Sequence, residues 1–300
     1  MSTRIVFAGS PDVAGPYLRA LHDAQFDIRA VVTRADSRQG RKGVVAPTAI
    51  ALIADELGLP VIKTNSLRDV DIPDVDIAVV VAYGGLVPTR LLDVPPNGWV
   101  NVHFSVLPKY RGAAPVQRAL WEGEPAAGIS IFRLVEELDA GPVYFSQTIA
   151  FEDDETASDA LARLAASTTD ELIGTLRVIT TGAIRPTQQV GEPSFAPKFT
   201  REDGRIDWSL DATTVIRRIR AVTREPGAFT SLKGELLAVL RVASHVGPKF
   251  PRGEVVVSEG RVYVGTADAS VELLDVKPAG KTSMSAMAWS RGQRADVVFE

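Results

Sequence analysis

The first half of the chain alternates short runs of β-branched, apolar residues with segments in which apolar residues recur at helical spacing. The runs predict four strands, at Arg4–Ala8, Asp27–Thr33, Ile77–Ala82 and Trp99–His103. The helical segments are Asp12–Leu21 and Thr48–Leu57. This alternation predicts an α/β fold with an open, mostly parallel sheet covered on both faces. Because such sheets bind ligands at the carboxyl ends of their strands, we expect a site just after Ala8, Ala82 and His103.

Two more strands and a helix complete this half. The strands are predicted at Gly128–Leu134 and Val143–Ile149, and the helix is predicted to begin at Thr156. Four leucines share one face of the predicted helix: Leu161, Leu164, Leu172 and Leu176. We therefore expect this helix to pack through that face.

A polar, irregular stretch from Pro186 to Pro197 has the composition of a linker. Beyond it, a helix is predicted at about Asp211–Val222. Short runs separated by glycines then predict the strands of a small β-barrel or sandwich, at Glu235–Ala243, Gly253–Val257, Arg261–Gly265 and Ser270–Val276. We therefore expect two domains, residues 1–188 and 205–300, joined by a linker at 189–204.

Composition excludes several classes of function. The chain has 300 residues, of which 45% are hydrophobic and 23% charged, which is typical of a globular protein. It has no cysteine, which excludes disulfides, thiolate nucleophiles and cysteine-ligated metals, and its three histidines are scattered, so we expect no metal. The apolar runs are too short for a signal peptide or a membrane span. We expect a cytoplasmic protein with no membrane partner.

The formal net charge of −4 is unevenly distributed. Residues 195–300 contain 16 Lys and Arg against 13 Asp and Glu, whereas the rest of the chain is acidic. This imbalance indicates either a polyanionic partner or chance variation in composition. The segment Arg34–Val45 is also basic and lacks an apolar period, and loops of that length are usually functional or disordered.

The residues best suited to catalysis lie between Asn101 and Pro115. If Trp99–His103 is a strand, its alternation places Asn101 and His103 on one face at the carboxyl end. An amide and an imidazole side by side can donate two hydrogen bonds to an oxyanion, although they could equally bond to neighbouring loops. Asp139, in a turn that ends in Gly141 and Pro142, offers a carboxylate, but an Asp in a turn often bonds only to the local backbone.

The other two histidines are poorer candidates for acid–base chemistry. His22 is expected at a solvent-facing helix end, and His245 is expected in a loop beside Gly247 and Pro248. The role therefore falls to His103. No G-x-G-x-x-G, Walker or G-x-S-x-G sequence is present, which disfavours nicotinamide, nucleotide-hydrolase and serine-hydrolase functions.

These motifs resemble those of a known family. The run Asn101–Pro115 resembles the N-x-H-x-S-L-L-P…R-G-A-A-P signature of folate-dependent formyltransferases, and Leu138–Gly141 resembles their L-D-x-G. Further matches lie at Ile5–Asp12, Val81–Gly84, Gln117–Trp121, Ala196–Lys198, Arg205–Trp208 and Pro278–Lys281. The matches near the carboxyl terminus resemble the members that act on methionyl-tRNA rather than on amino sugars.

The resemblance implies a Rossmann-like catalytic domain followed by a smaller OB-like β-barrel that binds tRNA. It implies that 10-formyltetrahydrofolate, the co-substrate, delivers its formyl group to the α-amine of methionyl initiator tRNA. Asn101 and a protonated His103 would stabilise the tetrahedral oxyanion, while Asp139 would keep His103 charged and accept or relay the proton of the amine. We expect the protein to act as a monomer.

The resemblance also implies binding sites. Folate is expected along two loops, at Ser105, Val106, Leu107 and Pro108 and at Val81, Tyr83, Gly84 and Leu86. The tRNA is expected at the basic segment and at the helix after Asp211, through Arg38, Arg41, Lys42, Arg217, Arg220 and Arg224. The three arginines of the helix fall in one sector, whereas Val215, Ile216, Ile219 and Val222 fall in another and are expected in the core.

Other functions stay open at this point. The chain could transfer the formyl group to a small amine such as an amino sugar, or hydrolyse formyltetrahydrofolate, with its second domain serving oligomer contacts. It could also be a non-enzymatic RNA-binding protein. The complete set of Asn101, His103 and Asp139 argues against the non-enzymatic alternative, and the motifs near the carboxyl terminus argue against the small amine.

Overall fold

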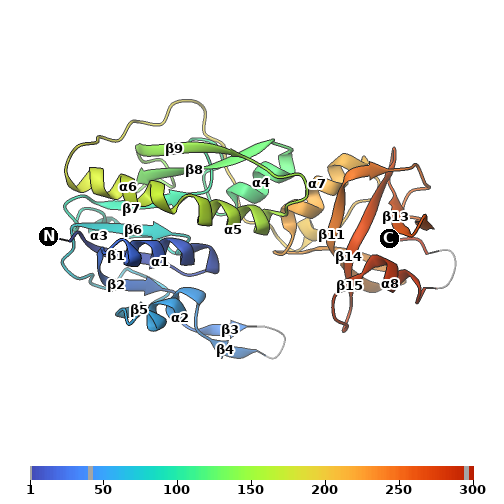
Figure 1. The fold of residues 1–300 in the computed structure, drawn as a ribbon, viewed down its shortest axis with the longest axis horizontal. Helices are drawn as coiled ribbons and strands as arrows, with labels where there is room; N and C mark the ends of the chain where they lie inside the picture. Colours follow the sequence, from blue (N-terminus) through green and yellow to red (C-terminus); the bar gives the residue numbers. More distant parts are fainter. Residues whose placement is uncertain (1, 40–42, 294–296) are drawn as a thin grey trace. The chain divides into compact units, whose positions relative to one another are not determined.

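The computed structural model describes residues 2–39, 43–293 and 297–300, which form two compact units (Figure 1). The first unit contains the chain up to Pro115 together with Ala127–Ile149 and Leu161–Ala196. The second unit is made of Val116–Ala126, Ala150–Ala160 and Pro197–Glu300. Two short segments from the first half of the sequence are therefore built into the second unit.

A seven-stranded sheet forms the centre of the first unit, in the order β5-β2-β1-β6-β7-β8-β9. Its strands are β1 (Arg4–Gly9), β2 (Asp27–Thr33), β5 (Val61–Lys63), β6 (Ile77–Val81), β7 (Trp99–His103), β8 (Ala126–Arg133) and β9 (Val143–Ala150). The strands from β5 to β7 are parallel, and β8 is antiparallel to β7. This mixed, mainly parallel sheet confirms the predicted α/β class.

The chain reverses its direction across the sheet at β1. It runs outward from β1 to β2 and β5, and then returns to β6 on the other side of β1. Gly9 pairs with Val81 at the carboxyl ends of β1 and β6. The crevice at such a reversal is where open α/β sheets bind ligands. The loops meet there, because Ser10 Oγ donates to the Tyr83 carbonyl at 2.9 Å and accepts from the Arg34 amide at 3.2 Å.

Both faces of the central strands β1, β6 and β7 are largely buried. On one face, side chains of the strands cluster with Tyr83, Leu91 and Trp99. On the other, α1 (Gly15–Asp23) packs against α6 (Thr169–Thr180) and α2 (Ala49–Glu56). The η1 turn (Asp12–Ala14) precedes α1. Helices α3 (Thr89–Leu92) and α4 (Pro115–Glu122) were not predicted, and α3 has only four residues.

The helix predicted from Thr156 onward is two helices, α5 (Ala157–Ser167) and α6. The break lies at Thr168, whose φ of −123° is not helical and whose hydroxyl donates to the Leu164 carbonyl at 2.7 Å. Three of the four leucines predicted to pack are buried, namely Leu164, Leu172 and Leu176. The prediction of a single helix was wrong, because a periodic apolar face can continue across a short break.

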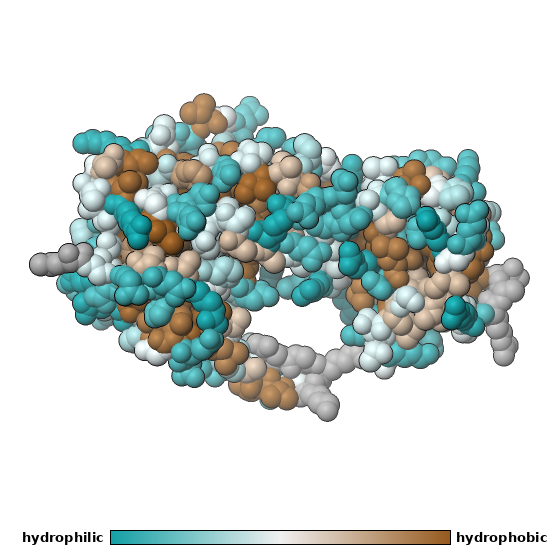
Figure 2. Space-filling view, in the orientation of Figure 1, coloured by the Kyte–Doolittle hydropathy of each residue, from teal (hydrophilic) through white to brown (hydrophobic). Residues whose placement is uncertain are grey.

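The basic segment forms a hairpin rather than an irregular loop. Strands β3 (Ser37–Gln39) and β4 (Val44–Ala46) pair antiparallel, with Arg38 opposite Val45. Arg38 is exposed, and Arg41 and Lys42 lie outside the described residues. Val44 and Val45 are 63% and 61% exposed, and Figure 2 shows an apolar patch over this hairpin.

An antiparallel sheet with the order β10-β11-β14-β13-β12 forms the second unit, and β15 pairs with β14. Its strands are β10 (Ala228–Leu232), β11 (Glu235–Gly247), β12 (Val255–Ser258), β13 (Arg261–Gly265), β14 (Ser270–Pro278) and β15 (Met284–Ser285). Among the residues described, no pairing joins β10 to β12, so the sheet does not close into a barrel. His245 lies within β11, so its predicted place in a loop was wrong.

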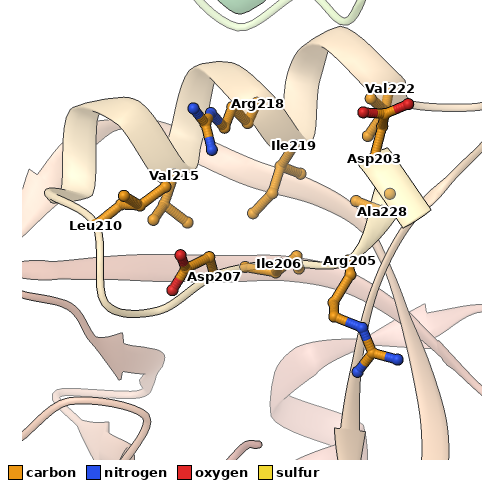
Figure 3. A pocket seen from close by; sticks show the side chains of 11 residues that line it. Asp203, Arg205, Ile206, Asp207, Leu210, Val215, Arg218, Ile219, Val222 and Ala228 are labelled. Carbon is orange, nitrogen blue, oxygen red and sulfur yellow. The ribbon is translucent and has the colours of Figure 1, made fainter. Parts of the chain in front are cut away.

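Helix α7 (Ala212–Val222) packs on this sheet, and η2 (Glu202–Gly204) and α8 (Ala286–Ser290) complete the unit. Asp211 caps α7 by accepting from the Thr214 amide at 2.9 Å. The apolar residues predicted for its core face are buried: Val215, Ile216, Ile219 and Val222. Figure 3 shows this face turned across a small hollow toward Ile206 and Ala228.

Candidate active site

The predicted histidine and carboxylate lie together at the carboxyl edge of the first unit's sheet. His103 is the last residue of β7, and Asp139 lies in the turn between β8 and β9. His103 Nδ1 is 3.8 Å from Asp139 Oδ2, and the two side chains are only 6% and 10% exposed. The structure therefore brings together two buried groups that are far apart in the sequence.

Asn101 lies two residues before His103 on β7. Successive side chains of a strand point to opposite faces, so Asn101 and His103 share one face as predicted. Asn101 is half-buried and pairs with Val80 of β6 and Phe132 of β8. An amide donor is thus available on the same face of the sheet as the imidazole.

The hydrogen bond of His103 Nε2 determines which ring nitrogen is free to react. Nε2 lies 2.8 Å from the carbonyl oxygen of Tyr110, which can only accept a hydrogen bond. Nε2 therefore carries a hydrogen, and the neutral ring presents the lone pair of Nδ1 toward Asp139. Nδ1 is consequently the basic atom of the site.

Burial lowers the pKa of His103, while the nearby Asp139 and the bond to Tyr110 act in the opposite direction. Burial prevails, so His103 is neutral at pH 7 in the protein without substrate. The protonated His103 expected from the sequence belongs to the step at which the oxyanion forms, and it stays a prediction.

The Asp139 carboxylate is held in place by its surroundings. The Gly112 amide donates to Oδ2 at 2.7 Å. Gln189 Nε2 donates to the carbonyls of Asp139 and Gly141, at 2.8 Å each. The φ of Asp139 is 47°, in the left-handed region that few non-glycine residues adopt. The turn that carries the carboxylate is therefore fixed by bonds from two separate segments.

The loop after β7 contains half of the residues predicted to bind folate. Ser130 Oγ donates to the Ser105 carbonyl at 2.7 Å and accepts from the Leu107 amide at 3.0 Å. The Ser105 hydroxyl donates to the Lys109 carbonyl at 2.6 Å. Ser105 and Leu107 are buried, whereas Val106 and Pro108 are partly exposed. Ser105 therefore shapes this loop from within.

The turn after β6 contains the other half of the residues predicted to bind folate. Val81 and Tyr83 are buried, and Tyr83 Oη donates to the Thr64 carbonyl at 3.1 Å. Burial raises the pKa of Tyr83. Gly84 has a φ of 77° and open space where a Cβ would lie, and Leu86 is 82% exposed. The accessible groups of this turn are therefore Gly84 and Leu86.

Of the three arginines predicted to share one sector of this helix, Arg217 and Arg220 lie on α7, whereas Arg224 lies beyond its last residue, Val222, so the predicted sector does not extend to Arg224. Arg220 Nε donates to the Glu155 carbonyl at 2.7 Å and its NH2 donates to the Glu152 carbonyl at 2.9 Å. Burial lowers the pKa of Arg220. Arg224 is exposed, and Arg217 is half-buried against Gly123, where a Cβ would come within 2.8 Å of NH1. Arg220 is thus bonded to the protein itself, while Arg224 is open to solvent.

Arg111 and Gln189 contribute to the site but were not singled out from the sequence. Arg111 donates to Gln189 Oε1 from Nε at 3.3 Å and from NH2 at 2.8 Å, and from NH1 to Glu137 Oε1 at 3.0 Å. Arg111 lies within the sequence motif of the site, and this position was the only sequence feature that could have indicated its role. Gln189 stood in a stretch of linker composition, so nothing local indicated its contact.

The chain is similar to known proteins over nearly its whole length. The formyl transferase family model matches residues 3–176, and the model of the formyl transferase C-terminal domain matches residues 198–294. The chain is 44% identical over 296 residues to a methionyl-tRNA formyltransferase of Clavibacter sepedonicus, covering 96% of this chain and 97% of the relative.

Solved structures share the fold. Methionyl-tRNA formyltransferase from Clostridium thermocellum has a TM-score of 0.56 at 15% identity, over 91% of this chain and 99% of that one. HypX from Aquifex aeolicus in complex with tetrahydrofolic acid has a TM-score of 0.66 at 17% identity, over 100% of this chain and 51% of that one. At these sequence identities, the similarity shows a shared fold alone.

Proposed function

The chain belongs to the formyl transferase family, among the methionyl-tRNA formyltransferases, and we propose that Asn101, His103 and Asp139 are its catalytic residues. Its activity is the transfer of the formyl group of 10-formyltetrahydrofolate to the α-amine of methionyl initiator tRNA. The product, formylmethionyl-tRNA, is used in translation initiation. Folate and tRNA are its partners in this reaction.

In the proposed mechanism, the His103–Asp139 pair handles the proton of the amine. The amine nitrogen forms a bond to the formyl carbon and loses one proton, which Nδ1 accepts. The imidazolium that results is stabilised by the Asp139 carboxylate at 3.8 Å. His103 is therefore neutral before the attack and charged after it.

Asn101 and the protonated Nδ1 then donate to the oxyanion of the tetrahedral intermediate. When the intermediate collapses, the bond from the formyl carbon to the folate nitrogen breaks, and that nitrogen takes the proton. One proton leaves the amine and one reaches tetrahydrofolate, so the protein ends as it began. No covalent enzyme intermediate is needed, which agrees with a chain without cysteine.

The observation that carries this proposal is the 3.8 Å approach of His103 Nδ1 to Asp139 Oδ2 at the carboxyl end of β7. Its functional test compares formyl transfer to methionyl initiator tRNA, uncharged tRNA and a free amino sugar. We expect transfer to the charged tRNA alone. Transfer to the amino sugar but not to the charged tRNA would contradict the proposed substrate.

We propose that folate binds along the two loops at this edge, at Ser105–Pro108 and Val81–Leu86. Backbone groups of these loops would recognise the edge of the pterin, and apolar side chains would cover its ring. The partly exposed Val106 and the exposed Leu86 support this assignment. Ser105, Leu107, Val81 and Tyr83 would support the loops from beneath.

For the tRNA we propose two contact regions. In the first unit these are Arg38 of the β3–β4 hairpin and, by the family resemblance, Arg41 and Lys42. In the second unit they are Arg217 and Arg220 on α7 and Arg224 just after its end, with Arg224 the most exposed. Lysine and arginine side chains that neutralise phosphates would make this binding dependent on salt.

We assign residues 1–188 to the catalytic domain, 189–204 to a linker and 205–300 to an OB-like tRNA-binding domain. Family models that match residues 3–176 and 198–294 support two domains, and the antiparallel sheet supports an OB-like fold. The first part of the proposed linker, up to Ala196, packs within the first compact unit. We further propose a cytoplasmic monomer. Within the described ranges, no helix is long and apolar enough to cross a membrane.

A further inference from the structure

A chain of polar side chains runs from Arg111 to the backbone of the Asp139 turn. Arg111 donates twice to Gln189 Oε1, at 3.3 and 2.8 Å, and its side chain is only 10% exposed. Gln189 Nε2 in turn donates to the Asp139 and Gly141 carbonyls. The amide of one glutamine thus connects a buried guanidinium to the turn that carries the proposed catalytic carboxylate.

The orientation of the Gln189 amide is set by its partners. A guanidinium can only donate, so the amide oxygen must face Arg111. The amide nitrogen then faces two carbonyls that can only accept, and both of its hydrogens are used. Rotation of the amide by half a turn would break every one of these bonds. Arg111 therefore selects the orientation in which Gln189 can hold the turn.

The turn needs such support because its backbone is unusual. Asp139 has a φ of 47°, and a Cβ at Gly141 would lie 1.7 Å from the Arg133 carbonyl oxygen. Residues in sparsely populated conformations persist only where their surroundings hold them. The two bonds from Gln189 act on the carbonyls at both ends of this tight segment.

Neighbours of Arg111 hold the other parts of the site. The Tyr110 carbonyl fixes His103 Nε2 at 2.8 Å, and the Gly112 amide bonds to the Asp139 carboxylate at 2.7 Å. Residues 110–112 thus touch His103 through the first residue, Gln189 through the second and Asp139 through the third. A displacement of Gln189 would therefore disturb the positions of both His103 and Asp139.

Gln189 is itself anchored on both sides. Thr187 exchanges two backbone hydrogen bonds with Val143, at 2.7 and 2.8 Å. Ser194 accepts from the Arg111 amide through its carbonyl at 2.8 Å and from the Tyr110 amide through its hydroxyl at 2.9 Å. The segment that carries Gln189 is therefore held by hydrogen bonds at Thr187 and at Ser194.

We propose that Gln189, oriented by Arg111, is a positioning residue that sets the Asp139 carboxylate against His103. This inference rests on the proposed catalytic role of Asp139. Gln189 touches neither folate nor tRNA in this proposal, so its loss should slow the chemical step and leave binding of both substrates intact. A misplacement of about 1 Å at a reacting group can cost about a hundredfold in rate.

The test uses Gln189→Met, which keeps the length of the side chain, and Gln189→Glu, which keeps an oxygen for Arg111 but loses both donated bonds. The matched control is Gln188→Ala, because Gln188 is the exposed neighbour of the same type. We expect kcat for methionyl initiator tRNA to fall about tenfold to a hundredfold in both Gln189 variants, as for other residues that orient reactive groups. KM for tRNA and for 10-formyltetrahydrofolate should stay unchanged, and the control should match the wild type.

Asp139→Asn, assayed beside them, separates the two proposals. If Asp139→Asn is inactive while both Gln189 variants keep wild-type kcat, the positioning role is overturned and the catalytic role stands. If Asp139→Asn keeps wild-type kcat, the catalytic role fails and the inference fails with it. A rise in KM without a fall in kcat, or an equal fall in kcat in Gln188→Ala, would also overturn the positioning role. Thermal melting identifies a Gln189 variant that fails to fold. In that case, kcat of the other Gln189 variant tests the positioning role.

Discussion

The Tyr110 carbonyl accepts a hydrogen bond from His103 Nε2 at 2.8 Å, and this one bond decides the chemistry of the site. It leaves Nδ1 as the basic nitrogen, opposite Asp139. Because the ring is buried, it starts neutral and can take up a proton, so the pair can act first as a base and then as a donor.

Asn101→Ala should slow the reaction and leave the fold intact. Loss of one oxyanion donor typically costs about 2.7–4 kcal/mol, which is a fall of about a hundredfold to a thousandfold in rate. The measurement is kcat for methionyl initiator tRNA, with thermal melting as the control for folding. A change of less than about threefold, far below that range, would remove Asn101 from the mechanism.

The stability of the protein should depend on pH through His103. Its pKa is lowered in the folded protein, so below about pH 6.5 the unfolded chain binds a proton that the folded protein does not. The free energy of unfolding should therefore be fully retained above pH 6.5 and fall as the pH drops below it. In His103→Gln this fall should be shallower. Urea unfolding at pH 7.5, 6.5 and 5.5 measures both, and equal pH dependence in the two proteins would contradict a buried neutral His103.

Gly141→Ala should disrupt the turn that carries Asp139. A Cβ at this position would lie 1.7 Å from the Arg133 carbonyl oxygen, so the backbone must move. We expect loss of activity and a lower melting temperature. Gly174→Ala is the matched control, because Gly174 lies in α6 with open space around its Cβ position. That change should be neutral or should stabilise by about 0.5–1 kcal/mol. Equal melting temperatures for the two variants would contradict the close approach.

Replacement of Arg217 and Arg224 by Ala should weaken tRNA binding and make it less sensitive to salt. Each lost phosphate contact reduces the slope of log K against log salt by about one. Binding of methionyl initiator tRNA between 50 and 200 mM salt, a range over which such contacts typically matter, measures this slope. An unchanged slope would exclude both arginines from phosphate contact.

Arg220→Met should lower the free energy of unfolding, independently of any effect on tRNA binding. Its guanidinium donates to the carbonyls of Glu155 and Glu152, which lose these partners in the variant. Hydrogen bonds to charged groups contribute about 1.5–3 kcal/mol each, and the half-buried position supports a value in that range. Thermal or urea unfolding checks this, with Arg224→Met as the exposed control. If the two variants are equally stable, these bonds do not stabilise the unit.

Local sequence patterns were sufficient to predict the strands that carry the site residues. Asp27–Thr33 and Trp99–His103 have their predicted bounds, because short runs rich in β-branched and aromatic residues indicate strands. Val61–Lys63 was missed because three residues carry no period. The β3–β4 hairpin was missed because both of its strands are short and its valines face solvent.

The catalytic candidates were recognisable because Asn101 and His103 share a strand and Asp139 lies in a turn before a strand, and a motif resemblance supported all three. Gln189 could not be found in this way. Its contacts with Arg111 and Asp139 span 78 and 50 positions, and no local periodicity encodes such a pairing. The protonation state of His103 could not be predicted from the sequence either, because its pKa depends on how completely the fold excludes water from the ring.

The most direct test of the His103–Asp139 pair is the single-turnover rate of formyl transfer to methionyl initiator tRNA by Asp139→Asn. Asparagine keeps an oxygen for the Gly112 amide but cannot stabilise a charged His103. We expect a fall of about a hundredfold to ten-thousandfold, the usual range for a lost acid–base group, with folate and tRNA still bound. A rate within about threefold of the wild type, well outside that range, would contradict the proposed role of the pair.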